Sequence, residues 1–370
     1  MRILVVHSND IKNYPPVISL LENLVHNGHK VTIICKDKTG FIKTNYGKVV
    51  RHRPLNNYTE TNKYKDISLF FKNRTLIKKL FEQEAPKNEV VWTTTAETVR
   101  EVGDLLLDHK HVMQLMELIE YVPQLPKAQF LKYDIKKYAR KAWKVVVPEE
   151  NRAYIQKVWW DLEDVPSVLP NKPYSMTIGS TPDELVPVLE EMEKEKRKIV
   201  LYQGVFLPDR NLDAFAEAID QMQDRYCMYI MGGSTDYQKE LCKRHPNIRY
   251  VPYVAAPNHL LVTQKADIGL LPYIPIKVDN SSILNALYCA PNKIYEYAAY
   301  GLPMIGSNVL GLKIPFEKFG MGLCCEKLAV PDVKKALEYI DENYESMKAA
   351  CSTFYASTDL DGIVKDILEV

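Results

Sequence analysis

The sequence carries little net charge and lacks several features that would assign a protein class directly. Its 370 residues include 48 Lys and Arg and 47 Asp and Glu, which leaves a formal net charge of +1. With no global field to attract nucleic acid, we expect no nucleic-acid partner. No apolar run approaches the roughly 20 residues that a helix needs to span a bilayer.

The cysteines indicate neither a disulfide-linked nor a zinc-stabilised fold. The seven cysteines are scattered and include no Cys-x-x-Cys pair, which argues against a disulfide framework and against structural zinc. This pattern suits a reducing compartment. The first residues read as a strand and lack the length and cleavage site of a signal peptide. We therefore expect a cytoplasmic protein, either free or at the inner face of a membrane.

What the sequence does contain is a regular alternation of strand and helix signals. Apolar runs such as Arg2–Val6 and Lys30–Cys35 alternate with helical patterns, and the alternation restarts at Ile199–Gln203 after a rigid break at Pro170–Pro173. A chain of this length favours two domains. The pattern predicts two successive doubly wound α/β domains, which bind ligands at the carboxyl ends of their strands.

The segment from Asn285 to Leu312 is the most informative. Pro291 suits the first turn of a helix, where its missing N–H is not needed, and Gly301 suits the left-handed cap after the last turn. Backbone N–H groups at such a helix start can receive a diphosphate. Lys293 would add a cation beside that phosphate, and Glu296 could accept hydrogen bonds from a ribose diol.

The sequence P-N-K-I-Y-E-Y-A-A-Y-G-L-P from Pro291 resembles the donor-site signature of the retaining GT-B glycosyltransferases, in particular glycosyltransferase family 4. The resemblance implies two Rossmann-like domains facing each other across a cleft, with the nucleotide-sugar donor bound by the second. It also implies that Glu296 binds the nucleotide ribose. Tyr288 stands where many family members have a second glutamate that contacts the donor sugar.

Two further segments fit the same resemblance. Gly204, followed by Arg210, resembles the loop after the first strand of the second domain, although Val205 stands where the family often has an arginine. Gly232 and Gly233 resemble the short glycine loop after another strand. The resemblance thus predicts a donor site formed by Gly204, Gly232, Gly233, Asn285, Tyr288, Pro291, Asn292 and Glu296. Arg210 and Lys293 would stabilise the leaving diphosphate.

In the first domain, Glu120 follows a strand and resembles the acidic loop that faces the acceptor, so we predict a catalytic role for it. The last stretch, Phe354 to Val370, resembles the family's final helix, which returns to the first domain. The predicted domains are therefore 1–170 plus 355–370, and 171–354.

A basic segment, Lys127–Lys144, offers a second kind of partner. It contains seven basic residues and one acidic residue, and Leu131, Ile135, Tyr138 and Ala142 fall on one face of a helix. A solvated helix is one interpretation. Attraction to an anionic membrane surface is the other, and it would suit a lipid-linked acceptor.

The resemblance implies sugar transfer from a UDP- or GDP-linked donor to a glycan or lipid-linked acceptor, with retention and without a metal. The sequence has no Asp-x-Asp pair of the metal-binding kind, and we expect neither a metal nor a cofactor. Two alternatives stay open: a nucleotide-sugar epimerase on the same fold, and a non-catalytic partner subunit of a glycosyltransferase.

Overall fold

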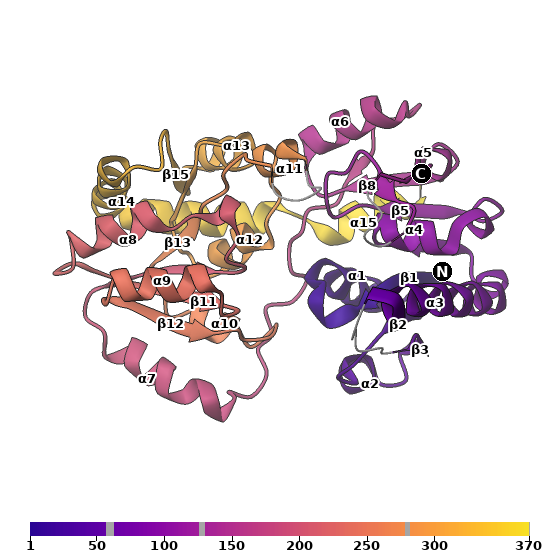
Figure 1. Cartoon of the computed structure of the whole chain (residues 1–370), viewed down its shortest axis with the longest axis horizontal. Helices are drawn as coiled ribbons and strands as arrows, with labels where there is room; N and C mark the ends of the chain where they lie inside the picture. Colours follow the sequence, from indigo (N-terminus) through magenta and orange to yellow (C-terminus); the bar gives the residue numbers. More distant parts are fainter. Residues whose placement is uncertain (57–62, 126–129, 278–281, 370) are drawn as a thin grey trace. The chain divides into compact units, whose positions relative to one another are not determined.

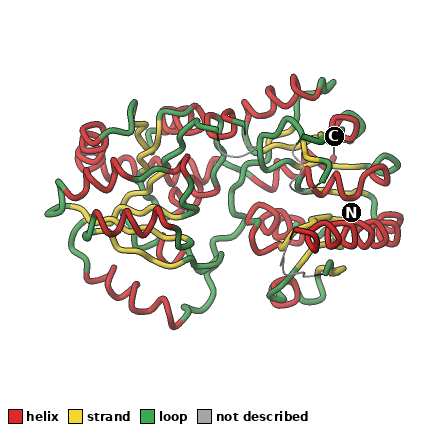
Figure 2. Tube along the Cα trace, viewed as in Figure 1, coloured by secondary structure: helices red, strands yellow, loops and turns green. Residues whose placement is uncertain are grey.

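The computed structural model describes residues 1–56, 63–125, 130–277 and 282–369. It contains two compact units, unit 1 made of Met1–Tyr174 with Asp359–Val370, and unit 2 made of Ser175–Thr358. The sequence placed these divisions after Pro170 and after Phe354. Each unit combines helices with a parallel sheet (Figure 1, Figure 2), and the predicted fold class, two Rossmann-like α/β domains, is confirmed.

The described part of unit 1 contains a seven-stranded sheet in the order β3-β2-β1-β4-β5-β8-β9. Its strands are β1 (Arg2–Asp10), β2 (Lys30–Lys36), β3 (Val50–Pro54), β4 (Val90–Thr93), β5 (His111–Gln114), β8 (Lys144–Val147) and β9 (Ser167–Val168). Its helices are α1 (Pro15–His26), α2 (Phe41–Tyr46), α3 (Lys63–Glu84), α4 (Ala96–Val102), α5 (Lys136–Ala139), α6 (Glu150–Trp160) and α15 (Leu360–Glu369). A separate antiparallel pair is formed by β6 (Val122–Pro123) and β7 (Lys132–Tyr133).

The sheet of unit 1 is buried on both faces. Along β1, Leu4 and Val6 belong to one apolar cluster, and Ile3 and Val5 belong to another. Successive side chains of a strand point to opposite faces, so apolar residues at consecutive positions require helices on both sides of the sheet. The continuous apolar run at the start of the sequence therefore reports a strand buried on both faces.

The C-terminal helix α15 packs in unit 1, as the resemblance implied. Leu360, Val364 and Ile367 are buried in the same cluster as Ile3 and Val5 of β1. The Asp361 carboxylate accepts hydrogen bonds from the side chains of Asn23 and Asn27 and from the Tyr174 hydroxyl, at 2.8, 2.7 and 3.0 Å. The helix begins at Leu360 rather than near Phe354, which belongs to the preceding helix and is buried in unit 2.

The described part of unit 2 contains a six-stranded sheet in the order β12-β11-β10-β13-β14-β15. Its strands are β10 (Lys198–Gln203), β11 (Tyr226–Gly232), β12 (Ile248–Pro252), β13 (Ile268–Leu271), β14 (Met304–Ser307) and β15 (Gly322–Cys325). Its helices are α7 (Val186–Lys194), α8 (Asp213–Asp220), α9 (Asp236–Arg244), α10 (Leu260–Thr263), α11 (Ile283–Leu287), α12 (Asn292–Ala299), α13 (Leu310–Phe319) and α14 (Val330–Ser357). With β10 as its first strand, this is the 3-2-1-4-5-6 order of dinucleotide-binding proteins.

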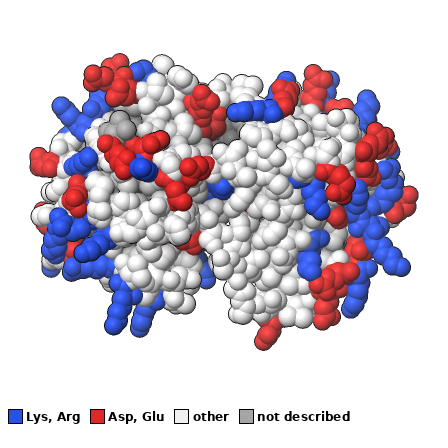
Figure 3. Space-filling model, turned by 180° about the vertical axis from the view of Figure 1, so that it is seen from behind, with Lys and Arg blue, Asp and Glu red and all other residues white. Residues whose placement is uncertain are grey.

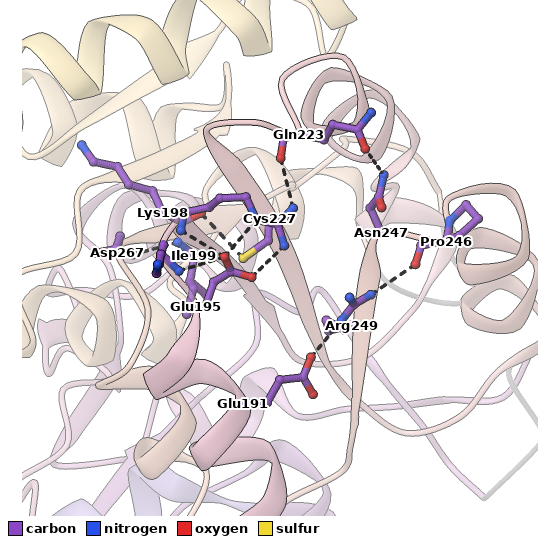
Figure 4. A network of polar contacts seen from close by, with 12 residues as sticks. Glu191, Glu195, Lys198, Ile199, Gln223, Cys227, Pro246, Asn247, Arg249 and Asp267 are labelled. Atoms are coloured by element: carbon purple, nitrogen blue, oxygen red, sulfur yellow. Dashed lines mark hydrogen bonds and ion pairs between the residues drawn. The ribbon is translucent and has the colours of Figure 1, made fainter.

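A polar network fixes the amino end of β10, at the opposite end of the strand from the loops that bind ligands in this fold (Figure 4). The Ile199 amide donates to the Asp267 carboxylate at 2.7 Å. Arg197 donates to Glu195 at 2.7 Å, and this hydrogen bond is the main reason that the pKa of Glu195 is lowered to about 2. The network anchors the central strand of unit 2, and we assign it a structural role.

The basic segment does not form the amphipathic helix expected from its sequence. Lys127 lies outside the described residues, and the described residues 130–143 contain only the short strand β7 and the one-turn helix α5. Leu131, placed on the apolar face by the helical pattern, is 44% exposed, whereas Ile135 and Tyr138 are buried. The helical spacing misleads because the chain reverses direction here through the β6–β7 pair.

Neither sign of charge dominates the surface. Acidic and basic side chains lie together toward both sides of the face shown in Figure 3, in keeping with the small net charge. Within the described ranges, no helix combines the length and the apolar character that crossing a membrane requires.

Candidate functional site

The strand order of unit 2 marks where a ligand is expected. From β10 the chain proceeds to β11 on one side, whereas β13 leads to β14 on the other, so the loops after β10 and β13 diverge. Such a switch point, at the carboxyl ends of the strands, is where α/β sheets bind ligands. Gly204 and Arg210 follow β10, and Tyr273 follows β13. Part of the predicted donor site therefore lies at this position.

Two of the predicted glycines are required by a close approach of backbone. Gly204 has a φ of 142°, which residues with a side chain rarely adopt, and its amide donates to the Met231 carbonyl at 2.9 Å. A Cβ on Gly232 would lie 2.1 Å from the Gly204 carbonyl oxygen. Gly233 is different, because a Cβ there would meet nothing within 4 Å. The loop after β10 thus rests directly on the end of β11.

The two predicted cations lie beside this loop and share an aromatic neighbour. Lys293 Nζ is 2.6 Å from the place that a Cβ on Gly204 would occupy. It lies 5.3 and 5.8 Å from the ring centroids of Tyr202 and Tyr273, and the Arg210 guanidinium carbon lies 3.8 Å from the Tyr273 centroid. These distances are in the range of cation–π contacts, so Tyr273 provides a surface on which both cations rest.

The two cations differ in how far protein carboxylates offset their charge. Arg210 Nη1 donates to the Asp209 carbonyl at 3.0 Å and also to the Asp209 carboxylate. Among the described residues, Lys293 forms an ion pair with no carboxylate. Burial, with a smaller contribution from the Arg210 cation, lowers the pKa of Lys293 to about 8, although Glu296 acts in the opposite direction. Lys293 is thus a poorly solvated cation that a bound anion would stabilise.

Glu296 lies on the same helix as Lys293 and is 5% exposed. Its Oε2 accepts a hydrogen bond from Gln203 Nε2 at 2.6 Å, and its Oε1 lies 3.3 Å from His259 Nε2. Burial alone would raise the pKa of this carboxyl group, but His259, Lys293 and Gln203 together outweigh burial and lower it. Glu296 is therefore held as a buried carboxylate.

The ends of α12 follow the sequence prediction closely. Gly301 follows the helix with a φ of 70°, the left-handed conformation expected of it. Pro291 is the cap residue before the helix rather than its first residue, because its ψ of 138° is extended. Asn292 and Lys293 therefore form the first turn, with their amides at the positive end of the helix.

The remaining predicted residues lie further from this group. Asn285 is within α11, and Tyr288 caps the end of that helix, on the segment that leads to α12. Glu120 belongs to unit 1, where it is exposed and its carbonyl oxygen accepts a hydrogen bond from Trp160 Nε1 at 2.9 Å. The structure thus groups Gly204, Gly232, Arg210, Lys293 and Glu296 around the switch point.

Four residues of this group were not among the predicted site residues, namely Gln203, Asp209, His259 and Tyr273. Gln203 and Tyr273 end or follow strands that flank the switch point, so the rule for α/β sheets could have selected them. His259 precedes the short helix α10, and no sequence signal marks it.

The fold and a family model indicate which class of proteins this chain resembles. The chain has the two-domain GT-B architecture, and residues 197–340, which include the grouped residues, match the family model described as Glycosyl transferases group 1. The resemblance predicted from the segment after Pro291 is confirmed over this range.

Solved structures share the fold along the whole chain at low sequence identity. A glycosyltransferase from Rickettsia africae is 16% identical, covers 100% of this chain and 97% of its own, and superposes with a TM-score of 0.68. Sucrose-phosphate synthase from Thermosynechococcus elongatus is 15% identical, covers 99% of this chain and 97% of its own, and has a TM-score of 0.68. HepE from Anabaena, solved with UDP-glucose, is 12% identical, covers 100% of this chain and 98% of its own, and has a TM-score of 0.69. No curated protein matches the chain significantly.

Proposed function

We propose that this protein transfers a sugar from a nucleotide-sugar donor to a glycan or lipid-linked acceptor in polysaccharide or glycoconjugate synthesis. The observation that carries the proposal is Lys293, a partly buried cation without an ion-pair partner among the described residues, beside Gly204 at the switch point. Such a cation is suited to the charge that grows on a departing diphosphate.

The proposed roles of the residues follow from their positions. Arg210, Lys293 and the first amides of α12 bind the diphosphate, and Gly204, Gly232 and Gly233 let the backbone approach it. Glu296 binds the ribose. Asn285 and Tyr288 contact the sugar, with Pro291 and Asn292 shaping the start of the helix. Glu120 acts on the acceptor side.

We further propose that transfer proceeds with retention and that the cations of the site replace a divalent metal. The UDP-glucose complex of HepE supports UDP as the first donor nucleotide to test, with GDP as the second. We place the reaction in the cytoplasm, at the inner face of a membrane. The exposed Lys132 and Lys141 of the basic segment support attraction to anionic lipid, whereas Lys137 and Arg140 are engaged by Asp104 and Asp161.

A thermal-shift panel of nucleoside diphosphates tests the proposal. A nucleotide present at 100 times its dissociation constant should stabilise the protein by about 2.7 kcal/mol. We expect one nucleotide to raise the Tm equally with and without Mg²⁺, and we expect Glu296→Ala to abolish most of this rise. Glu342→Ala, an exposed carboxylate on α14, is the matched control and should respond like the wild type. Flat curves for every nucleotide would favour the non-catalytic partner subunit instead.

Nucleotide binding should also take up a proton above neutral pH. The pKa of Lys293, about 8 in the free protein, must rise when a diphosphate binds beside it, because the anion favours the charged form. The contribution of Lys293 to affinity should therefore be constant well below pH 8 and fall as the pH rises through 8. Titration calorimetry at pH 9 in two buffers of different ionisation enthalpy measures the uptake.

Lys293→Arg is the control for this proton uptake, because an arginine stays protonated throughout this range. We expect Lys293→Arg to abolish the uptake while keeping a positive charge in the site. Equal proton uptake by the wild type and Lys293→Arg would show that another group is titrated.

A further inference from the structure

Four polar residues form a largely buried ring around the Glu296 carboxylate, to which His259 contributes both its side chain and its backbone carbonyl. Gln203, Thr263 and Glu296 are at most 5% exposed, and the His259 side chain is 15% exposed. The Thr263 hydroxyl lies 2.7 Å from Gln203 Oε1 and 3.2 Å from the His259 carbonyl oxygen. The ring therefore joins the end of β10 to α10 and α12, three elements that are distant in the sequence.

The hydrogen bonds of the ring fix the orientation of the Gln203 amide and the tautomer of His259. Gln203 Oε1 accepts from Thr263, so Gln203 Nε2 must face Glu296, where it donates at 2.6 Å. A carboxylate only accepts hydrogen bonds. The His259 nitrogen at 3.3 Å from Glu296 therefore carries its proton on Nε2. Each oxygen of Glu296 thus has one protein donor before any ligand binds.

This leaves acceptor capacity for two more donors. The two oxygens of a carboxylate offer about four lone-pair positions, and among the described residues Gln203 and His259 occupy one on each oxygen. The two positions that remain equal in number the hydroxyl groups of a diol. If either protein donor were lost, the carboxylate could rotate away from such a pair, and burial would favour its protonated form.

We infer that His259 and Gln203 are positioning residues that hold the Glu296 carboxylate to read a ribose 2′,3′-diol, so that the site selects ribonucleotides over deoxyribonucleotides. The inference rests on the proposed function, because the diol belongs to the donor nucleotide. A site that hydrogen-bonds a hydroxyl rejects the analogue that lacks it more strongly than an apolar pocket rejects a change in size.

A glutamine or an asparagine can replace one ring nitrogen of a histidine at a time. Comparing the two variants distinguishes a residue that positions Glu296 from one that only fills space. In His259→Gln the side-chain amide reaches the place of Nε2 and can still donate to Glu296. In His259→Asn the amide reaches only the place of Nδ1, so the hydrogen bond to Glu296 is lost. A histidine that merely fills space would make the smaller Asn variant less stable without changing which sugar is preferred.

The experiment compares Kd for UDP and 2′-deoxy-UDP by calorimetry in the wild type and both variants, or for GDP and 2′-deoxy-GDP if the panel selects GDP. We expect the wild type to prefer the ribonucleotide at least tenfold and His259→Gln to keep most of this ratio. His259→Asn should bring the ratio of the two Kd values to within about threefold of one, mainly by weakening the binding of the ribonucleotide. Gln203→Met should do the same, and it replaces His259→Asn if that variant fails to fold.

The outcomes separate the inference from the proposed function. A wild type that binds ribo- and deoxyribonucleotide equally well overturns the inference and leaves a nucleotide site in place. An unchanged ratio in His259→Asn or Gln203→Met also overturns it. A wild type that binds neither nucleotide defeats the proposed function itself.

Discussion

Replacing Lys293 by methionine should weaken nucleoside diphosphate binding by about 1.5–3 kcal/mol, the usual value of a hydrogen bond to a charged group. Turnover should fall further, by roughly 10²–10³-fold, because the charge on the leaving diphosphate is largest in the transition state. Methionine keeps most of the volume of the side chain but removes the charge, and with it the cation–π contacts with Tyr202 and Tyr273. Calorimetry with UDP and a donor-consumption assay measure the two effects.

Stability provides the decisive control for this variant. Burial lowers the pKa of Lys293, which means that its charged form destabilises the folded protein, so Lys293→Met should unfold at the same or a higher temperature. A lysine retained for folding would give the opposite result. Lys335→Met, at an exposed position on α14, should change neither binding nor turnover. A Lys293→Met protein with full UDP affinity would contradict the role given to this residue.

Replacing Gly232 by alanine should lower the free energy of unfolding by about 1–3 kcal/mol, the usual effect of forcing extra atoms into a packed site. The added Cβ would lie 2.1 Å from the Gly204 carbonyl oxygen and 2.9 Å from the Phe206 ring. The loop after β10 must then move away from β11, and the surface beneath Lys293 moves with it. We therefore expect a lower Tm together with weaker UDP binding.

The neighbouring glycine is a matched control for the stability change. Gly233 has open space around its Cβ position and no left-handed backbone. Gly233→Ala should keep the free energy of unfolding within about 0.5 kcal/mol of the wild type. Thermal unfolding of both variants without nucleotide makes the comparison. If Gly232→Ala proves as stable as Gly233→Ala, the contact between the loop after β10 and β11 is not as close as the structure shows.

Much of the fold could be predicted because its signals are local. Apolar runs buried on both faces mark β1 and β10, and the Pro291 and Gly301 positions mark the ends of α12 to within one residue. The helix start brought Lys293 and Glu296 into the predicted site, and the family resemblance added Gly204 and Arg210.

The rest could not be predicted, because it depends on contacts between distant segments. His259 reaches Glu296 only because the strand order carries the loop after β12 to the same edge as α12. Tyr273 lies under Arg210 because β13 adjoins β10. The helix predicted for the basic segment was wrong because a local pattern was misleading there. Leu131, Ile135 and Tyr138 have helical spacing, but the chain reverses direction through the β6–β7 pair.

The return of α15 to unit 1 sets an order for folding during synthesis. Unit 2 is one continuous stretch, Ser175–Thr358, placed within unit 1, and the Tyr174 hydroxyl contacts Asp361 where the chain leaves and re-enters unit 1. The ribosome supplies the stripe of Leu360, Val364 and Ile367 only after all of unit 2. Domains usually fold from the N-terminus onward as they emerge, but here we expect the later domain to complete its core first. We expect unit 1 to expose the face that α15 covers until these last residues emerge.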